Sequence, residues 1–304
     1  RSEMIVKVKE PLPSEFSLFH KGQILFCYLH LAANRDLTLS LLEKGVVAIA
    51  YETVQDYKKE LPLLAPMSEI AGRCAVIIGA YLLARNKGGS GIFIGGVPGV
   101  LPSMVLVLGG GTVGTNAAKI AAGLGARVIV MDIDSHRMRY LDDILPPNVS
   151  TCYSTIYAIR EILPSADLVI GAVLVPGGKT PRLITRDMLT LMRKGSVIVD
   201  VSVDQGGCIE TTHPTTHDNP TFTVEGIVHY CVANIPGVYA RTSTIALTNA
   251  TLPYIIKVAD VGYCRAFAED EGFAMGLNLA EGKITCRPVA EAHGMGWVEW
   301  RKAV

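Results

Sequence analysis

The stretch that decides the fold is Met104-Val-Leu-Val-Leu-Gly-Gly-Gly-Thr-Val-Gly114. Its apolar residues predict a buried strand, and the glycines that follow predict a tight turn. Small and apolar residues then recur at helical spacing from 116 to 125, and a β-branched run over 128–131 predicts a second strand that ends at Asp132. The order strand, glycine turn, helix, strand and acid is typical of a dinucleotide-binding site.

Each glycine of this turn has its own expected task. Gly109 permits the tight turn, Gly111 lets the backbone approach a pyrophosphate, and Gly114 lets helix and strand pack closely. The intervening Thr112 and Val113 open the helix, where free N–H groups and the positive end of the dipole receive phosphates. We therefore expect a nicotinamide dinucleotide here, although a purely structural glycine turn has the same pattern.

Asp132 lies 23 residues after Gly109, where a carboxylate accepts both ribose hydroxyls of an adenosine. The same negative charge repels a 2′-phosphate at close range. The sequence therefore predicts NAD rather than NADP as the cofactor, with Arg127, Arg137 and Arg139 close enough to oppose that preference.

The composition limits the function classes. The 304 residues are 49% apolar and 18% charged, which suits an α/β enzyme with a buried parallel sheet and is long enough for two domains. The chain has 28 lysine and arginine residues and 28 aspartate and glutamate residues, so it carries no net charge that would attract nucleic acid or an anionic membrane. The longest apolar stretch, Cys74–Ala84, is too short to span a bilayer. Seven cysteines without a CxxC motif predict buried thiols in a reducing, cytoplasmic compartment, and no pattern indicates a metal.

The remaining segments predict a Rossmann-type doubly wound parallel sheet and a second, smaller α/β substrate domain. Strands are expected at 4–11, 23–30 and 46–50, and further along at 165–171, 196–202, 222–224 and 228–232. Helices are expected at 37–44, 68–85, 135–145, 158–163 and 185–192, and a long one bent at Pro253 from 243 to about 268. We expect domain segments 1–62 (substrate), 63–240 (dinucleotide) and 241–304 (returning to the substrate domain).

Hydride transfer to a nicotinamide leaves a proton for the protein to handle, and histidine titrates near neutrality. Of the seven histidines, His30 has the best placement because it ends an apolar strand. A buried structural histidine is an equally good interpretation of it. Asp204 follows an inner strand beside two glycines, with a capping or turn aspartate as the alternative. Lys9 ends the first strand, and a solvated strand lysine explains it equally well.

Eight segments resemble the NAD-dependent alanine dehydrogenase family, and the resemblance extends over nearly the whole chain to about Gly294. They are Lys7–Pro11, Tyr28–Ala32, Ala50–Val54, Pro62–Gly72, Gly95–Gly99, Ile170–Gly177, Val203–Cys208 and Ala246–Ala250. The related NAD-binding subunit of transhydrogenase shares the fold but fewer of these motifs.

The resemblance assigns roles to individual residues. It implies that Lys9 holds the substrate carboxylate and that His30 and Asp204 form the catalytic pair. The implied cofactor contacts, besides the glycine turn, are Ser68, Asp132, Arg137, Ser154, Val173, Leu174, Val201, Ser202, Val203, Asp204, Val232, Ala233, Asn234 and Ile235.

The implied reaction is the reversible oxidative deamination of L-alanine. Loss of a hydride from Cα to NAD yields an iminium, which water attacks, and the resulting carbinolamine collapses to pyruvate and ammonia. His30 is expected to shuttle protons at the developing carbonyl oxygen, and Asp204 to orient the water and stabilise the cationic nitrogen. The partners are then small molecules, and the family's hexamers imply a homo-oligomer.

Two other interpretations stay open at this point. One is a transhydrogenase-like subunit that binds NAD(H) and passes hydride to a partner protein, in which case Lys9, His30 and Asp204 have no amino-acid chemistry to perform. The other is an inactive, truncated family member. By the resemblance, relatives begin with a further strand and helix that carry a substrate-binding arginine, so we expect the chain without that segment to bind NAD but to oxidise alanine poorly. Residues after Gly294, with Trp297 and Trp300, extend past the usual family end.

Overall fold

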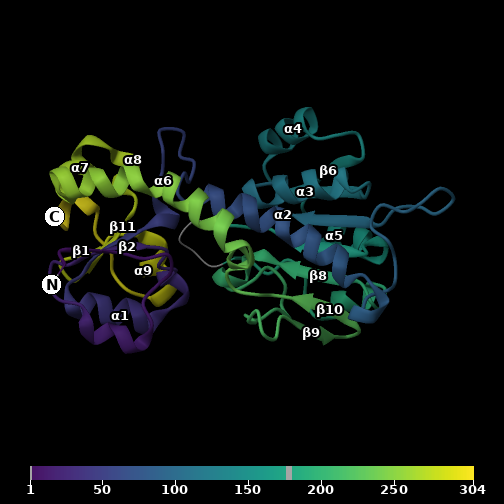
Figure 1. Cartoon of the computed structure of the whole chain (residues 1–304), viewed down its shortest axis with the longest axis horizontal. Helices are drawn as coiled ribbons and strands as arrows, with labels where there is room; N and C mark the ends of the chain where they lie inside the picture. The colour runs from purple at the N-terminus through teal and green to yellow at the C-terminus, as the bar shows by residue number, and fades with distance from the viewer. Residues whose placement is uncertain (1, 176–179) are drawn as a thin grey trace. The chain divides into compact units, whose positions relative to one another are not determined.

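The structure, a computed structural model, describes residues 2–175 and 180–304 (Figure 1). The chain divides into two compact units. One comprises the segment up to Pro66 together with Thr244–Val304, and the other comprises Met67–Leu174 and Thr180–Ser243. The loop expected at Ala172–Gly178 is described as far as Val175, and its remaining residues lie outside the described part.

The larger unit is built on a seven-stranded sheet, which confirms the predicted α/β class. Its strand order is β6-β5-β4-β7-β8-β10-β9, and all neighbours are parallel except β9 and β10. If β9 is set aside, the remaining six strands have the order of a Rossmann fold. The direction in which successive strands are added to the sheet reverses between β4 and β7. The strands are β4 (Met104–Leu108), β5 (Arg127–Asp132), β6 (Val149–Tyr153), β7 (Leu168–Gly171), β8 (Val197–Asp200), β9 (Thr221–Val224) and β10 (Ile227–Tyr230).

Alternate residues of β4 enter two separate cores, because successive side chains of a strand point to opposite faces. Val105 and Val107 pack in one core with α2 (Ala65–Leu82) and α3 (Thr112–Gly123). Leu106 and Leu108 pack in the other with α5 (Ile156–Ile162). Burial on both faces explains why β4 reads as a continuous apolar run rather than an alternating one.

The smaller unit contains a five-stranded sheet of order β1-β2-β3-β11-β12. The first three strands are parallel, and β11 and β12 are each antiparallel to the preceding strand in that order. Its aromatic core brings Phe26 within 4.6 Å of Tyr51 and 5.9 Å of Phe273, between ring centroids. Its elements are β1 (Met4–Val6), β2 (Ile24–Cys27), β3 (Val47–Ala50), β11 (Leu277–Ala280), β12 (Lys283–Ile284), α1 (Arg35–Lys44), α7 (Tyr263–Glu269), α8 (Glu271–Ala274) and α9 (Arg287–His293).

Several expected elements differ from the structure. The strands expected at 4–11 and 23–30 are shorter, because β1 ends at Val6 and β2 ends at Cys27, so Lys9 and His30 follow these strands rather than end them. The long helix does not reach residue 268: α6 (Ala240–Val261) ends before Gly262, whose φ of 74° breaks the helical path, and α7 follows. The helix expected at 185–192 is a short 3₁₀ helix, η6 (Asp187–Leu191). The strand expected at 196–202 ends at Asp200, because that side chain accepts a hydrogen bond from the Ser202 N–H and starts the 3₁₀ helix η7 (Val201–Gln205).

Candidate active site

The glycine turn between β4 and α3 has the shape that a dinucleotide needs. Gly109 has a φ of +100°, which L side chains rarely adopt. A Cβ at Gly114 would lie 1.8 Å from the Gly109 carbonyl oxygen, so helix and strand pack closely only with glycine there. At Gly111, by contrast, a Cβ would meet nothing within 4 Å, and this face of the turn is open. The residues present therefore fit a pyrophosphate at the start of α3.

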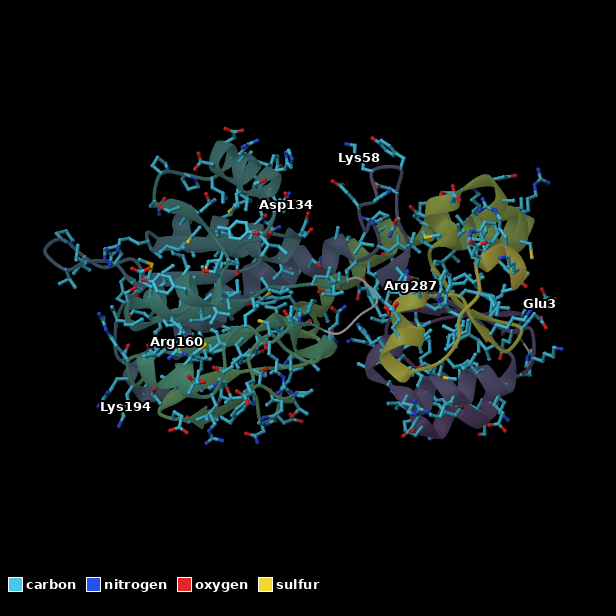
Figure 2. The ribbon with its side chains drawn as sticks, turned by 180° about the vertical axis from the view of Figure 1, so that it is seen from behind. Glu3, Lys58, Asp134, Arg160, Lys194 and Arg287 are labelled. Atoms are coloured by element: carbon cyan, nitrogen blue, oxygen red, sulfur yellow. The ribbon has the colours of Figure 1, made fainter. Side chains whose placement is uncertain are left out.

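Asp132 ends β5 with its carboxylate held against this turn. Oδ2 accepts the Gly110 N–H at 2.6 Å, and Oδ1 accepts the Asp134 N–H at 2.9 Å. Each carboxylate oxygen can accept a second hydrogen bond, so the group retains capacity for two ribose hydroxyls. Asp134 in turn caps α4 (Ser135–Ile144), where Figure 2 labels it.

Arg137, on α4, closes the outer side of the turn. Its Nε donates to the Gly110 carbonyl oxygen at 2.6 Å, and its Nη2 donates to Thr115 Oγ1 at 2.8 Å. The guanidinium also lies over the Tyr140 ring, 5.0 Å from its centroid. These contacts place a fixed positive charge beside the glycine turn.

The other expected cofactor residues share one edge of the seven-stranded sheet, because each follows the carboxyl end of a parallel strand. Ser154 follows β6, Val173 and Leu174 follow β7, Val201, Ser202, Val203 and Asp204 follow β8, and Val232, Ala233, Asn234 and Ile235 follow β10. Ser202 Oγ donates to the Val173 carbonyl oxygen at 2.7 Å and so ties two of these segments together. Ser68 is buried on α2 in the same unit.

Asp200, which the sequence reasoning missed, holds the turn that carries Asp204. Its carboxylate is fully buried and accepts hydrogen bonds from Ser202 N, Cys208 N and Thr212 Oγ1 at 3.0, 3.0 and 2.8 Å. Burial raises the pKa of Asp200, although these hydrogen bonds oppose the rise. An acid at the end of an apolar strand, followed by a glycine pair, is the sequence signal that could have found it.

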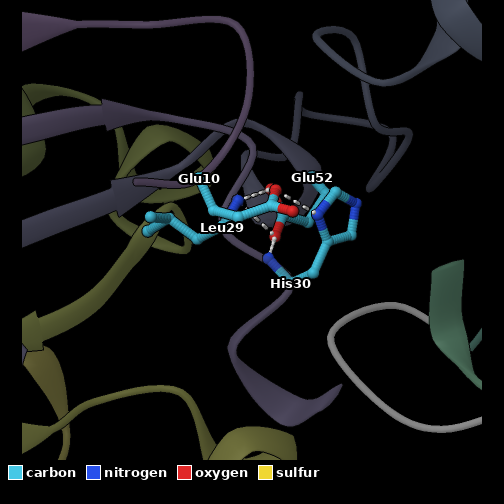
Figure 3. A network of polar contacts seen from close by, with 4 residues as sticks. All are labelled: Glu10, Leu29, His30 and Glu52. Carbon is cyan, nitrogen blue, oxygen red and sulfur yellow. Dashed lines mark hydrogen bonds and ion pairs between the residues drawn. The ribbon is translucent and has the colours of Figure 1, made fainter. Parts of the chain in front are cut away.

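In the smaller unit, Lys9, His30 and Glu52 follow β1, β2 and β3, so they lie toward the carboxyl edge of its parallel strands. His30 has a left-handed backbone, with φ 49° and ψ 37°. The buried Glu52 carboxylate accepts the N–H groups of His30, at 2.7 Å, and Leu29, at 3.1 and 3.2 Å. The ring Nδ1 of His30 lies 3.2 Å from Glu10 Oε2 (Figure 3).

The sequence reasoning assigned no role to Glu10 or Glu52. Both lie inside segments that carried the family resemblance, Lys7–Pro11 and Ala50–Val54, so the signal was present without a role attached. Burial raises the pKa of Glu10, but the hydrogen bond with His30 and the charges of Lys9 and His30 outweigh it, and the pKa is lowered overall. Glu10 is therefore ionised at neutral pH.

The expected residues fall in both units. Lys9 and His30 belong to the smaller unit, whereas Asp204 and the cofactor residues belong to the larger one. Two other histidines have structural surroundings. His229 is fully buried, with its ring stacked on Phe222, and His213 stacks on that same ring.

His293 is half-buried. Its Nε2 lies 2.8 Å from the Leu31 carbonyl oxygen. This contact ties α9 to the turn that follows His30, so His293 belongs to the packing of the smaller unit.

A cavity of about 430 Å³ in the smaller unit is lined by neither Lys9 nor His30. Trp297, Trp300, Met275 and Cys286 are among the residues that form its walls. Within residues 2–175 and 180–304, no group of three or more His, Cys, Asp or Glu side chains could hold a metal ion. No helix in the same described part is both long and apolar enough to cross a membrane.

Comparison with known families gives two matches that cover most of the chain. Residues 1–71 match the family described as Alanine dehydrogenase/PNT, N-terminal domain, and residues 75–287 match Alanine dehydrogenase/PNT, C-terminal domain. An alanine dehydrogenase of Halomonas elongata is 55% identical over 98% of this chain and 80% of its own length. That of Methanococcus maripaludis is 53% identical over 100% of this chain and 82% of its own, so the residues after Gly294 have a counterpart in this relative and the expectation that they extend past the family's end is wrong.

Solved structures agree with these relatives. An L-alanine dehydrogenase aligns with a TM-score of 0.86 and 51% identity over 96% of this chain and 81% of that one. A transhydrogenase from Sinorhizobium meliloti aligns with a TM-score of 0.73 over 94% of this chain and 80% of that one, but at 22% identity. The second likeness concerns the fold alone.

Proposed function

Since the chain belongs to the alanine dehydrogenase/PNT family, we propose that it catalyses the NAD-dependent, reversible oxidative deamination of L-alanine to pyruvate and ammonia. The observation that carries the proposal is the presence in one chain of two sets of residues. One is a glycine turn with an acid at the end of β5, suited to NAD. The other is a histidine held by two carboxylates, suited to proton transfer.

The NAD is held by the larger unit in this proposal. The open face at Gly111 and the start of α3 receive the pyrophosphate, and Asp132 accepts the ribose hydroxyls. The chemistry supplied by the bound nicotinamide is removal of a hydride from the alanine Cα, which leaves an iminium on the substrate. Everything after that step is proton transfer and water addition, which the protein's own side chains perform.

Lys9 holds the substrate carboxylate through its ammonium group. A single ammonium attracts a carboxylate strongly but orients it less strictly than a guanidinium, so Lys9 contributes mainly to binding. Its position just after β1 places it in the same part of the smaller unit as His30.

His30 moves the protons. It takes one from the water that adds to the iminium carbon, and in the reverse direction it gives one to the carbonyl oxygen of pyruvate. Asp204 orients that water and stabilises the cationic nitrogen. His30 then gives the proton that it took from water to the amino nitrogen, the C–N bond breaks with ammonia as the leaving group, and the hydroxyl proton passes to His30 as the carbonyl of pyruvate forms.

The test is an assay of both directions, followed by nicotinamide absorbance, with product identification by mass spectrometry. L-alanine plus NAD is expected to give NADH and pyruvate, and NADH plus pyruvate is expected to be consumed only when ammonium is present. D-alanine serves as the control substrate. Hydride exchange between nucleotides without any need for alanine or ammonium would overturn the proposal in favour of a transhydrogenase-like subunit.

A further inference from the structure

Two carboxylates from different segments converge on His30, one on its backbone and one on its ring (Figure 3). We propose that Glu10 is a positioning residue that fixes the tautomer of the His30 ring and stabilises the protonated form of that ring. Glu52 holds the backbone of His30 and so sets the direction of its side chain. This inference rests on the proposed role of His30 as the proton shuttle.

The backbone is held in a conformation that it would not adopt unaided. A left-handed backbone conformation is strained at a non-glycine residue, and His30 has a φ of 49°. The buried Glu52 carboxylate accepts the two consecutive N–H groups of Leu29 and His30, and such charge-assisted bonds are among the stronger ones. Strain held in place at one residue is characteristic of functional sites, and here the strained residue is the histidine itself.

The ring is held by a group that can only accept. Glu10 is ionised at neutral pH because its hydrogen bond with His30 and the nearby charges of Lys9 and His30 lower its pKa despite burial. An ionised carboxylate has no proton to donate, so the 3.2 Å contact requires the proton on Nδ1 of His30. In the neutral ring, Nε2 then carries the lone pair and acts as the base.

The charge of Glu10 also favours the imidazolium form of His30. Glu52, which accepts the His30 N–H, and the Tyr28 ring, stacked 6.2 Å away between centroids, also lie close to His30, and the positive charge of Lys9 acts on Glu10. The 3.2 Å contact between Glu10 Oε2 and Nδ1 brings the Glu10 carboxylate into direct contact with the imidazole.

Glu10→Gln is the informative change because an amide is similar in size but neutral and can donate as well as accept, so it no longer imposes one tautomer. The matched control is Glu15→Gln, which removes another carboxylate of the same segment, one that binds Lys7 rather than the histidine. Glu10→Asp keeps the charge with a shorter reach, and Glu10→Ala is the second variant should Glu10→Gln fold poorly.

The first measurement does not depend on catalytic activity. Diethyl pyrocarbonate modifies neutral imidazole, so the rate of His30 modification against pH, followed by peptide mass spectrometry, reports the midpoint of the ring's titration. Glu10→Gln is expected to lower that midpoint by about 1 pH unit or more, while Glu15→Gln leaves it unchanged and Glu10→Asp moves it less. An equal midpoint in wild type and Glu10→Gln would overturn the inference.

The second measurement uses alanine oxidation. Glu10→Gln is expected to lower kcat roughly 10-fold or more, within the ~10²–10⁴-fold that a general acid–base group contributes, with NADH affinity unchanged. The acidic limb of the kcat profile should move to lower pH. Wild-type inactivity, or full activity of His30→Ala, would count against the proposed function instead. An active wild type, an inactive His30→Ala and an unaltered Glu10→Gln would count against Glu10 alone.

Discussion

The backbone N–H of Gly110 donates to Oδ2 of Asp132 at 2.6 Å, which joins the turn after β4 to the acid that ends β5. The carboxylate is thus fixed on the same side of the sheet as the glycine turn. Its charge and its remaining lone pairs are available where the adenosine ribose of a bound dinucleotide lies in this fold.

We therefore expect the protein to prefer NAD to NADP and Asp132→Ala to lose most of that preference. The lost ribose hydrogen bonds are worth about 1–3 kcal/mol, and the repulsion of a 2′-phosphate disappears with them. The measurement is kcat/KM for both cofactors. Asp143→Ala, which removes an exposed acid of α4, is the control and should keep the preference. Equal use of both cofactors by the wild type would contradict the assignment.

His30→Ala and Asp204→Asn are each expected to lower kcat by roughly 10²–10⁴-fold, since each removes a group that we propose acts on protons or charge in the transition state. NADH binding, measured by fluorescence, should stay within a few-fold of wild type. His136→Ala, which removes an exposed histidine, is the control. If a variant retained the wild-type kcat, the substituted residue would have a structural rather than a catalytic role.

Lys9→Ala is expected to raise the KM for pyruvate, because the substrate carboxylate loses its cationic partner. A fall in kcat as well would indicate that the ammonium also orients the substrate. Lys7→Ala is the matched control, since Lys7 lies in the same segment and pairs with Glu15 instead. Similar KM values for the two variants would argue against a binding role for Lys9.

Asp200→Ala is expected to destabilise the larger unit by roughly 2–6 kcal/mol, because the buried N–H groups of Ser202 and Cys208 lose their acceptor at about 1–3 kcal/mol each. The measurement is denaturant unfolding. Asp187→Ala removes an exposed acid paired with Arg160 and should change little. An unchanged unfolding midpoint for Asp200→Ala would mean that the turn carrying Asp204 is held by other contacts.

Acid is expected to destabilise the protein through His229. Burial lowers the pKa of this ring, His213 adds to the effect, and the bond to the Ile227 carbonyl opposes it in part. The unfolded chain therefore binds the proton at higher pH than the folded one, so stability is lost as pH falls below about 6.5.

The measurement is the free energy of unfolding against pH. His229→Gln should remove part of the slope between pH 7 and 5, by at most about 1.4 kcal/mol per pH unit. His136→Gln should leave the slope as in wild type. A slope shared by all three proteins would show that His229 does not control the acid response.

The dinucleotide-binding pattern of the larger unit could be predicted from the sequence alone. The run from Met104 to Asp132 carries its information locally: apolar residues form the strands, glycines permit the turn, and the acid ends the second strand. Local backbone preferences set the turn, and the continuous apolar run indicates that β4 is buried on both faces, although it does not identify the elements that cover them. The α/β class and the turn geometry followed from them.

The surroundings of His30 could not be predicted from the sequence, because they depend on how distant segments pack together. Glu10 lies 20 residues before it and Glu52 lies 22 after it, and no local spacing links the three. They meet because β1, β2 and β3 pair in parallel, which places the segments after the strands at one edge of the sheet. The Asp200 carboxylate likewise accepts hydrogen bonds from Ser202, Cys208 and Thr212. These residues reach it because the loop after β8 folds back on the end of that strand. Strand pairing is a long-range choice that depends on the whole buried core, so sequence spacing alone does not reveal which carboxylate reaches the histidine.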